Sequence, residues 1–289
     1  MTNLLRAGVV LFFLSLAVWA ITLNHHDRVI AHSEPWLWLT TALVSVGPEL
    51  AGIVIGVVTI DYLNERRQDE QLKGQLILQL GSKHNDVTDT ALRVLTARGW
   101  LYDGSLSDAF LVTANLSGAE LEGADLSGAN LWRANLSESH FREANLSRAH
   151  LPEAYLVGTS LWGADLSGAY LQGANLTRAT LPLANLSGAN LWRVNLSGAN
   201  LLGADLSGVS FWAANLSMAS LSEANLSGAT EWTIRQIKSV ETLKGAIMPD
   251  GVQLTGEYIE GTILEEWETD YLARHGGTET DIRDRMYDT

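Results

Sequence analysis

The sequence predicts a β-solenoid, and three regularities between residues 106 and 226 carry that prediction. A large apolar residue recurs at every fifth position, which makes 25 positions, all of them Leu except Phe141 and Phe211. Ala stands two residues earlier at 20 of 24 positions. The residue directly before the leucine alternates in kind from one repeat to the next. Internal repetition of this order takes precedence over any other indication of fold.

A period of five fits neither a helix nor a straight strand. In a helix each leucine would advance by ~140° around the axis, and in a strand successive leucines would point to opposite faces. The chain can bury all of them only if it turns a corner once per repeat. We therefore number each repeat from its leucine, position i, and expect Ala at i−2 and Leu at i to point inward.

A second period, of ten residues, indicates flat sides of two alternating kinds. In the repeats from Asn115 to Asn225, Asn or Asp precedes the leucine in 11 of 12 cases. In the intervening repeats, from Phe110 to Ser220, it does so in only 3 of 12. Strict alternation requires an even number of sides.

The repeat resembles the pentapeptide-repeat family, whose signature is A-[DN]-L-x-x. Residues 124–128 read Ala-Asp-Leu-Ser-Gly and residues 134–138 read Ala-Asn-Leu-Ser-Glu. The resemblance covers residues 101–230, about 45% of the chain. It implies a right-handed quadrilateral β-helix with four repeats per turn, and hence about six coils and ~30 Å of height at the ~4.8 Å spacing of stacked strands.

Residues 1–62 predict a transmembrane helical hairpin with spans at about 7–23 and 36–60. The first run is uncharged and close to the length that crosses ~30 Å of hydrocarbon, although a cleaved signal peptide is the alternative. The second run is interrupted by Glu49. A carboxylate at mid-membrane costs ~2.5 kcal/mol, so Glu49 either lies near the headgroups or has a role in transport or assembly.

Basic residues flank the two runs on their outer sides, with only Arg28 in the loop between them; they are Arg6, Arg66, Arg67 and Lys73. This asymmetry places both ends in the cytoplasm. The expected localisation is the bacterial cytoplasmic (inner) membrane, with the repeat domain on its cytoplasmic side and the lipid bilayer as one partner.

Helical segments are expected on both sides of the repeat. Residues 63–100 predict a helical connector and N-terminal cap, with a helix through residue 80 and a second one begun by Asn85 or Asp86. Residues 231–289 predict a C-terminal helical cap and an acidic tail, with a helix from Thr230 to about Leu243, then irregular coils, then a last helix at 264–274. Such caps are needed because a terminal repeat exposes apolar core and unpaired backbone.

Composition excludes several classes of function. The chain has no cysteine, which rules out disulfides and thiol chemistry, and a net charge of −14, which argues against direct binding of nucleic acid phosphates. No glycine-rich phosphate loop, paired metal-ligating histidines or nucleophile motif occurs. We therefore expect no enzyme activity, no cofactor, no metal and no small-molecule substrate.

Outward positions hold an unusual number of tryptophans. Residues 20 apart should stack in one column, and two such columns, on opposite sides, carry the aromatic side chains. The candidate interaction surface consists of Trp132, Arg133, Trp162, Trp192, Arg193 and Trp212. Trp and Arg are typical anchors of protein interfaces, although scattered surface tryptophans of no consequence are the alternative.

Three functions are compatible with these features. The leading hypothesis is a non-catalytic, membrane-tethered scaffold or protein-interaction module that binds a protein partner or itself. The first alternative is a nucleic-acid mimic, similar to pentapeptide-repeat proteins that bind and protect DNA gyrase. The repeat has 11 acids against 5 bases, a modest excess for such a role. The second alternative is a membrane transport or assembly role that depends on Glu49.

Overall fold

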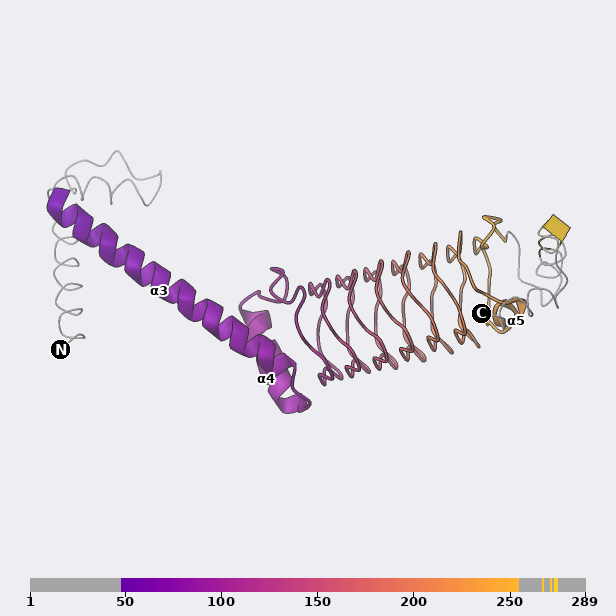
Figure 1. The fold of residues 1–289 in the computed structure, drawn as a ribbon, viewed down its shortest axis with the longest axis horizontal. Coiled ribbons are helices and arrows are strands. Elements are labelled where there is room, and N and C mark those ends of the chain that lie inside the picture. The colour runs from indigo at the N-terminus through magenta and orange to yellow at the C-terminus, as the bar shows by residue number, and fades with distance from the viewer. Residues whose placement is uncertain (1–47, 255–266, 268–270, 272, 275–289) are drawn as a thin grey trace, which may run out of the picture. The chain divides into compact units, whose positions relative to one another are not determined.

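The computed structural model describes residues 48–254 together with Trp267, Tyr271, Ala273 and Arg274 (Figure 1). Its helices are α3 (Pro48–Leu80), α4 (Asn85–Ala97) and α5 (Ile234–Lys238), and stacked coils occupy the chain between α4 and α5. The chain divides into two compact units, Met1–Glu70 and Gln71–Thr289. The predicted span 7–23, residues 36–47 of the second span, and most of the predicted helix 264–274 lie outside the described residues.

Helix α3 corrects the predicted localisation. It is one continuous helix of 33 residues, and its apolar part ends at Ile60, after which Asp61 and Glu65 follow in the same helix. A transmembrane helix needs ~20 consecutive apolar residues. Within the described ranges, none of the helices combines the length and the apolar character that crossing a bilayer requires. This finding contradicts the prediction of an inner-membrane protein with its repeat domain on the cytoplasmic side.

Helix α4 and the segments beside it close the N-terminal end of the coils. One side of α4, comprising Thr88, Ala91, Leu92 and Leu95, is buried. The Thr88 hydroxyl donates to the Asn115 carbonyl at 2.9 Å, and the Asn115 N–H donates to the Ser82 carbonyl at 2.8 Å. The expected side-chain cap by Asn85 or Asp86 is absent, since His84 is the N-cap residue and makes no side-chain capping bond.

The repeat region forms coils of 20 residues. Parallel bridges join each residue before a leucine to the residue 20 positions later, from Phe110 with Asn130 through to Ser210 with Thr230. Four five-residue repeats therefore complete one turn, which confirms the solenoid that the period of five predicts. Figure 1 shows the coils stacked one on the next along a common axis.

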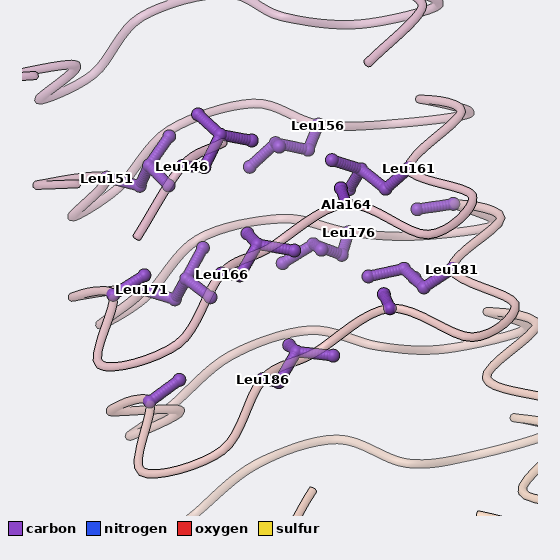
Figure 2. Close-up of a cluster of buried hydrophobic side chains, with 14 of the residues drawn as sticks. Leu146, Leu151, Leu156, Leu161, Ala164, Leu166, Leu171, Leu176, Leu181 and Leu186 are labelled. Carbon is purple, nitrogen blue, oxygen red and sulfur yellow. The ribbon is translucent and has the colours of Figure 1, made fainter. Parts of the chain in front are cut away.

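Leucine and alanine fill the interior of the coils. The inward positions from Leu106 to Leu226 have exposed fractions of 0–1%, and most of the alanines at i−2 are equally buried. In Figure 2, leucines from four successive repeats of one coil point toward one another, and the leucines of the next coil lie directly below them. The small Ala beside the large Leu lets a narrow coil close without a void.

A regular repeat satisfies four of its five backbone N–H groups with backbone carbonyls, and most repeats of the solenoid follow this pattern. The N–H groups at i and i+2 donate to the next coil, that at i−1 donates to the previous coil, and that at i−2 closes the corner. In the repeat 164–168 these bonds are Leu166 to Asn185 (2.7 Å), Gly168 to Ser187 (2.9 Å), Asp165 to Ala144 (2.9 Å) and Ala164 to Leu161 (3.1 Å).

The fifth N–H group, at i+1, explains why Asn or Asp precedes the leucine. In that same repeat the Ser167 N–H donates to Asp165 Oδ1 at 2.9 Å, and the same contact recurs along the solenoid. The side-chain oxygen at i−1 thus accepts a hydrogen bond from an N–H group that the backbone ladder leaves unsatisfied. Pro152 and Pro182 occupy the i+1 position of repeats that lack Asn or Asp at i−1. Proline has no N–H, so these repeats need no such acceptor.

Every corner of the solenoid holds a residue with positive φ at position i+2. The values lie between 53° and 67° from Asp108 to Gly228, and 13 of these 25 residues are not glycine. A positive φ at the third position of a four-residue turn is what a type II turn requires. The corners therefore impose a conformational cost on every Arg, Glu or Leu found there.

Helix α5 is shorter than the predicted helix from Thr230 to Leu243. Its N-cap is Thr233, which forms a capping box with Gln236. The helix ends early because the chain rejoins the ladder, where the Glu241 N–H donates to the Ala219 carbonyl at 2.8 Å. The Gln236 amide also donates to the exposed coil end, to the carbonyls of Phe211 (2.9 Å) and Ala214 (2.8 Å).

The C-terminal end is closed by a hairpin and an aromatic cluster. Ile247 pairs with Asn225 in parallel and with Gln253 in antiparallel fashion, which ends the ladder. Trp232, Trp267 and Tyr271 pack together, with ring centroids 5.1–5.7 Å apart.

Asp250 holds this closure in place. Its carboxylate accepts from the Trp267 indole N–H at 3.3 Å and from the Arg274 guanidinium at 2.8 Å. Burial alone would raise the pKa of Asp250, but hydrogen bonds from the Val252 N–H, the Trp267 indole and the Arg274 guanidinium lower it overall. A carboxylate held in this way stabilises the closed end in its ionised form.

Candidate interaction surface

The outward side chains fall into columns because residues 20 apart lie on adjacent coils. We call the side formed by the columns that begin at Phe110, Val112 and Thr113 the aromatic face. Its three columns run through Phe110, Asn130, His150, Tyr170, Asn190 and Ser210; through Val112, Trp132, Pro152, Gln172, Trp192 and Trp212; and through Thr113, Arg133, Glu153, Gly173, Arg193 and Ala213. The opposite face begins at Glu120, Glu122 and Gly123. The two sides between them carry mostly Asn, Asp, Ser and Gly.

Aromatic rings stack along the aromatic face in the way the columns require. The rings of Trp192 and Trp212 have centroids 5.2 Å apart at an interplanar angle of 39°. In the neighbouring column His150 stacks on Tyr170 with centroids 4.6 Å apart. Contacts at this range favour a fixed orientation of both rings. The face therefore presents preformed aromatic surface.

Two arginines brace these rings. The Arg193 guanidinium lies 4.8 Å from the centroid of Trp192 and 5.3 Å from that of Trp212, so one cation spans both indoles. Arg133 lies 4.8 Å from the Trp132 ring and donates to Glu153 Oε2 at 2.7 Å. A cation over an indole face is stabilising by ~0.5–1 kcal/mol at an exposed site.

These rings remain in contact with solvent despite the stacking. Trp132 is 41% exposed and Trp192 is 40% exposed, and in the adjacent columns Phe110 is 71% and Tyr170 is 43% exposed. Trp212 is half-buried. Exposed aromatic surface of this extent on one side of a folded protein usually marks a contact site.

The structure separates Trp162 from the other predicted residues. Trp132, Arg133, Trp192, Arg193 and Trp212 share the aromatic face, whereas Trp162 lies on the opposite face. There it packs under Arg142, whose guanidinium is 4.3 Å from the ring centroid. Trp162 is half-buried, so it belongs to a separate and less exposed local cluster.

Charge distinguishes the aromatic face from the opposite face. The aromatic face carries Arg133, Arg193 and Glu153, a net charge of +1. The opposite face carries Glu120, Glu122, Glu143 and Glu223 against Arg142, a net charge of −3. In a chain of net charge −14, the aromatic face is thus a locally basic, apolar side.

Exposed apolar residues outside the predicted interaction set occur on both faces. Phe110 and Tyr170 extend the aromatic face, and reading the i−1 column with the same 20-residue spacing would have found them. Leu183 and Leu202 form an apolar area on the opposite face, and Leu183 has a φ of 58°. No pattern in the sequence distinguishes these two leucines from inward ones except their place in the repeat.

Glu49 lies in the first turn of α3, and its side chain is outside the described part of the structure. Among the described residues, no group of three or more His, Cys, Asp or Glu side chains is placed to hold a metal ion. His140, on the opposite face, contacts Glu120 at 3.0 Å, and His150 stacks on Tyr170.

A family model described as "Pentapeptide repeats" matches this region in eight copies, over residues 101–133, 124–163, 134–173, 163–201, 174–212 and 204–230. The chain belongs to the pentapeptide-repeat family. Family membership, together with the 20-residue coils, identifies the fold as the right-handed quadrilateral β-helix that the resemblance implied. The match indicates no enzyme family.

Solved pentapeptide-repeat structures resemble parts of the chain. HetL of the cyanobacterium Nostoc sp. strain PCC 7120, involved in heterocyst differentiation regulation, is 39% identical over 51% of this chain and 67% of its own, with a TM-score of 0.37. A pentapeptide-repeat protein of the Arabidopsis thaliana thylakoid lumen is 31% identical over 47% of this chain and 85% of its own, with a TM-score of 0.23. QnrB1, a plasmid-mediated fluoroquinolone resistance protein, is 23% identical over 55% and 84%, with a TM-score of 0.40. At these scores the similarities indicate no function for this chain. A comparison with curated proteins gives no match.

Proposed function

We propose that this pentapeptide-repeat protein is a non-catalytic protein-interaction module, and that the aromatic face is its contact surface. The observation that carries the proposal is the exposed stack of Trp192 and Trp212 bridged by Arg193. A monomeric solenoid gains nothing from leaving stacked indoles in water, whereas a partner that covers them recovers ~25 cal/mol per Å² of apolar area.

Preorganisation supports the same conclusion. The indoles are held by stacking and by arginine, and the coils beneath them are fixed by the backbone ladder. A partner that binds here therefore loses little conformational freedom in the solenoid. Rigid aromatic and arginine anchors in the middle of a surface are typical of the residues that dominate interface energies.

A nucleic-acid mimic is less well supported by the charge distribution. B-DNA presents one negative charge per ~1.7 Å, so six coils of ~4.8 Å would need to present ~15 or more charges. The side with a column of carboxylates carries Asp108, Asp125, Asp165 and Asp205 against Arg148. The acids alternate with asparagines, and Asn145 donates to Asp125 at 3.0 Å. Four acids and one base cannot reproduce the charge density of a duplex.

The proposal is tested with a double variant of the full-length chain, Trp192→Ala with Trp212→Ala. Chemical crosslinking in cells followed by purification of the tagged chain should show that crosslinked species are lost in the double variant. Trp162→Ala is the matched control, because it removes one indole braced by an arginine from the opposite face. Identical crosslinking profiles for the wild type and the double variant would refute the proposal.

A further inference from the structure

We propose that the partner of the aromatic face is a second copy of this chain, packed face to face and antiparallel. The proposal rests on the proposed function, because both use the aromatic face. It adds the identity of the partner and the register in which the two copies pack. The two-fold axis crosses the face at the coil that holds Tyr170, Gln172 and Gly173. In such an interface each column faces the same column of the other copy, and coils equally far above and below the axis meet.

Charge complementarity selects this register. In the third column of the face, Glu153 lies one coil before Gly173 and Arg193 lies one coil after it. The two-fold axis therefore brings Glu153 opposite Arg193 of the second copy, and Arg193 opposite Glu153 of the second copy. Arg133 already binds Glu153 within the chain at 2.7 Å, so each Glu153 carboxylate would lie between two guanidinium groups.

The apolar residues fit the same axis. Trp132 lies two coils from Gln172 and faces Trp212 of the second copy. Pro152 lies one coil from Gln172 and faces Trp192 of the second copy. At the axis itself, Gln172 and Tyr170 each meet their own counterparts. The six indoles of the dimer, three from each copy, are thus covered in this register.

An axis placed half a coil earlier, between Pro152 and Gln172, is excluded by charge. That register pairs Trp132 with Trp192 of the second copy, but it also places Arg133 opposite Arg193 of the second copy. Like charges in direct opposition disfavour an interface. A parallel arrangement loses the pairing of Glu153 with Arg193 altogether, because each coil then meets the same coil.

The charge of the whole chain points to this side as well. Two copies of net charge −14 repel each other, and their opposite faces, at −3 each, would add to that repulsion. The aromatic face, at +1, brings the copies together with the least opposition. From Val112 to Trp212 it extends ~24 Å at ~4.8 Å per coil. A strip of that length and roughly 15 Å width buries on the order of 400 Å² per copy, or roughly 800 Å² in total, which is below the ~1,200 Å² of stable complexes and predicts a weak, transient association.

Charge reversal tests the register. Sedimentation velocity of the full-length chain from about 10 to 300 µM should show a monomer–dimer equilibrium. Glu153→Arg alone and Arg193→Glu alone should each raise the dissociation constant at least tenfold, and the double variant should restore it. Arg178→Glu is the matched control, because Arg178 is a corner arginine with φ 57° on a side outside the aromatic face, and it should leave dimerisation unchanged.

A crosslink tests the axis, and the absence of native cysteine makes it unambiguous. Gln172→Cys should form an intermolecular disulfide under mild oxidation, because only residues on a two-fold axis meet their own copies. Ser197→Cys, on another side of the solenoid, should not. Unfolding midpoints of Gln172→Cys, Ser197→Cys and Arg178→Glu should stay within about 2 °C of the wild type, because these side chains face outward. Glu153→Arg and Arg193→Glu lose the ion pair with Arg133 and the cation over two indoles, respectively, so their midpoints should fall by a few degrees while the chain stays folded.

The outcomes separate this inference from the proposed function. A chain that stays monomeric to 300 µM, or single reversals that the double variant does not rescue, overturns the antiparallel dimer. If crosslinking in cells still depends on Trp192 and Trp212 in that case, the aromatic face binds a different protein and the proposed function stands. If neither measurement responds to the face, both proposals are wrong.

Discussion

The positive-φ corners predict that replacing alanine by glycine raises the free energy of unfolding, which is the opposite of the usual effect. Ala213 occupies a corner with φ 53°, and Gly188 occupies an equivalent one with φ 64°. Exchanging alanine for glycine normally destabilises a protein, because glycine is more disordered in the unfolded chain. Here the folded conformation itself penalises alanine, so Ala213→Gly should stabilise the protein and Gly188→Ala should destabilise it.

The magnitude follows from two opposing quantities. A left-handed conformation costs an L-residue ~1–2 kcal/mol, and glycine loses ~0.4–1 kcal/mol through the greater freedom of the unfolded chain. The difference leaves ~0.5–1 kcal/mol in favour of glycine. Gly188 isolates this effect, because no neighbouring atom lies within 4 Å of the position its Cβ would take.

Thermal and denaturant unfolding of the full-length variants measures the effect, with the midpoint expected to rise for Ala213→Gly and to fall for Gly188→Ala. Because solenoids need not unfold in one step, the transition of the repeat should be followed by amide exchange at its own coils. A fall in stability for Ala213→Gly of ~0.5 kcal/mol or more would refute the reasoning that these corners are strained for alanine.

Three further substitutions test other parts of the structure. Leu166→Ala empties a fully buried position and should cost ~3 kcal/mol in denaturant unfolding, whereas Leu202→Ala, 40% exposed, should cost less than ~1 kcal/mol; equal losses would contradict the assignment of inside and outside. Gln236→Ala leaves the carbonyls of Phe211 and Ala214 without their amide donor, so amide exchange should accelerate at the last coils before the first ones; uniform acceleration would contradict a local capping role. Asp250 has a lowered pKa in the folded chain, so its contribution is present at neutral pH and is lost as the pH falls from 3.8 through its lower folded pKa. Asp250→Asn should therefore lower stability at pH 7 and make progressively less difference as the pH falls below 3.8, and a deficit that persisted unchanged in acid would contradict this linkage.

The repeat was predictable because its period is geometrically restrictive. Once Leu must face inward every five residues, the corners, the core and the columns follow, and the stack of Trp192 on Trp212 is already implied by their separation of 20 residues. What the pattern does not contain is side-chain conformation. The bridging of both indoles by Arg193, and of Arg133 to Glu153, depends on rotamers that only the packed coils determine.

Two failures have identifiable causes. The end of the repeat predicts Thr230 as the cap of the following helix, whereas Thr233 and Gln236 form the capping box, with the spacing that such boxes require. The helix is short because Glu241 must return to pair with Ala219, a tertiary constraint that local propensity does not reveal. The membrane prediction rested on the length of two apolar runs and on the basic residues that flank them, whereas the described helices, α3 among them, do not combine the length and apolar character of a membrane span.

Radical footprinting of the tryptophans tests the proposed contact surface most directly. Oxidation rates of Trp132, Trp162, Trp192 and Trp212 are measured by mass spectrometry for the full-length chain in intact cells and for the dilute purified chain. Slower oxidation in cells at Trp132, Trp192 and Trp212, with Trp162 unchanged, is the expected result. If each of the four indoles oxidises as fast in cells as in the dilute purified chain, the aromatic face is in contact only with water and the proposed function is wrong.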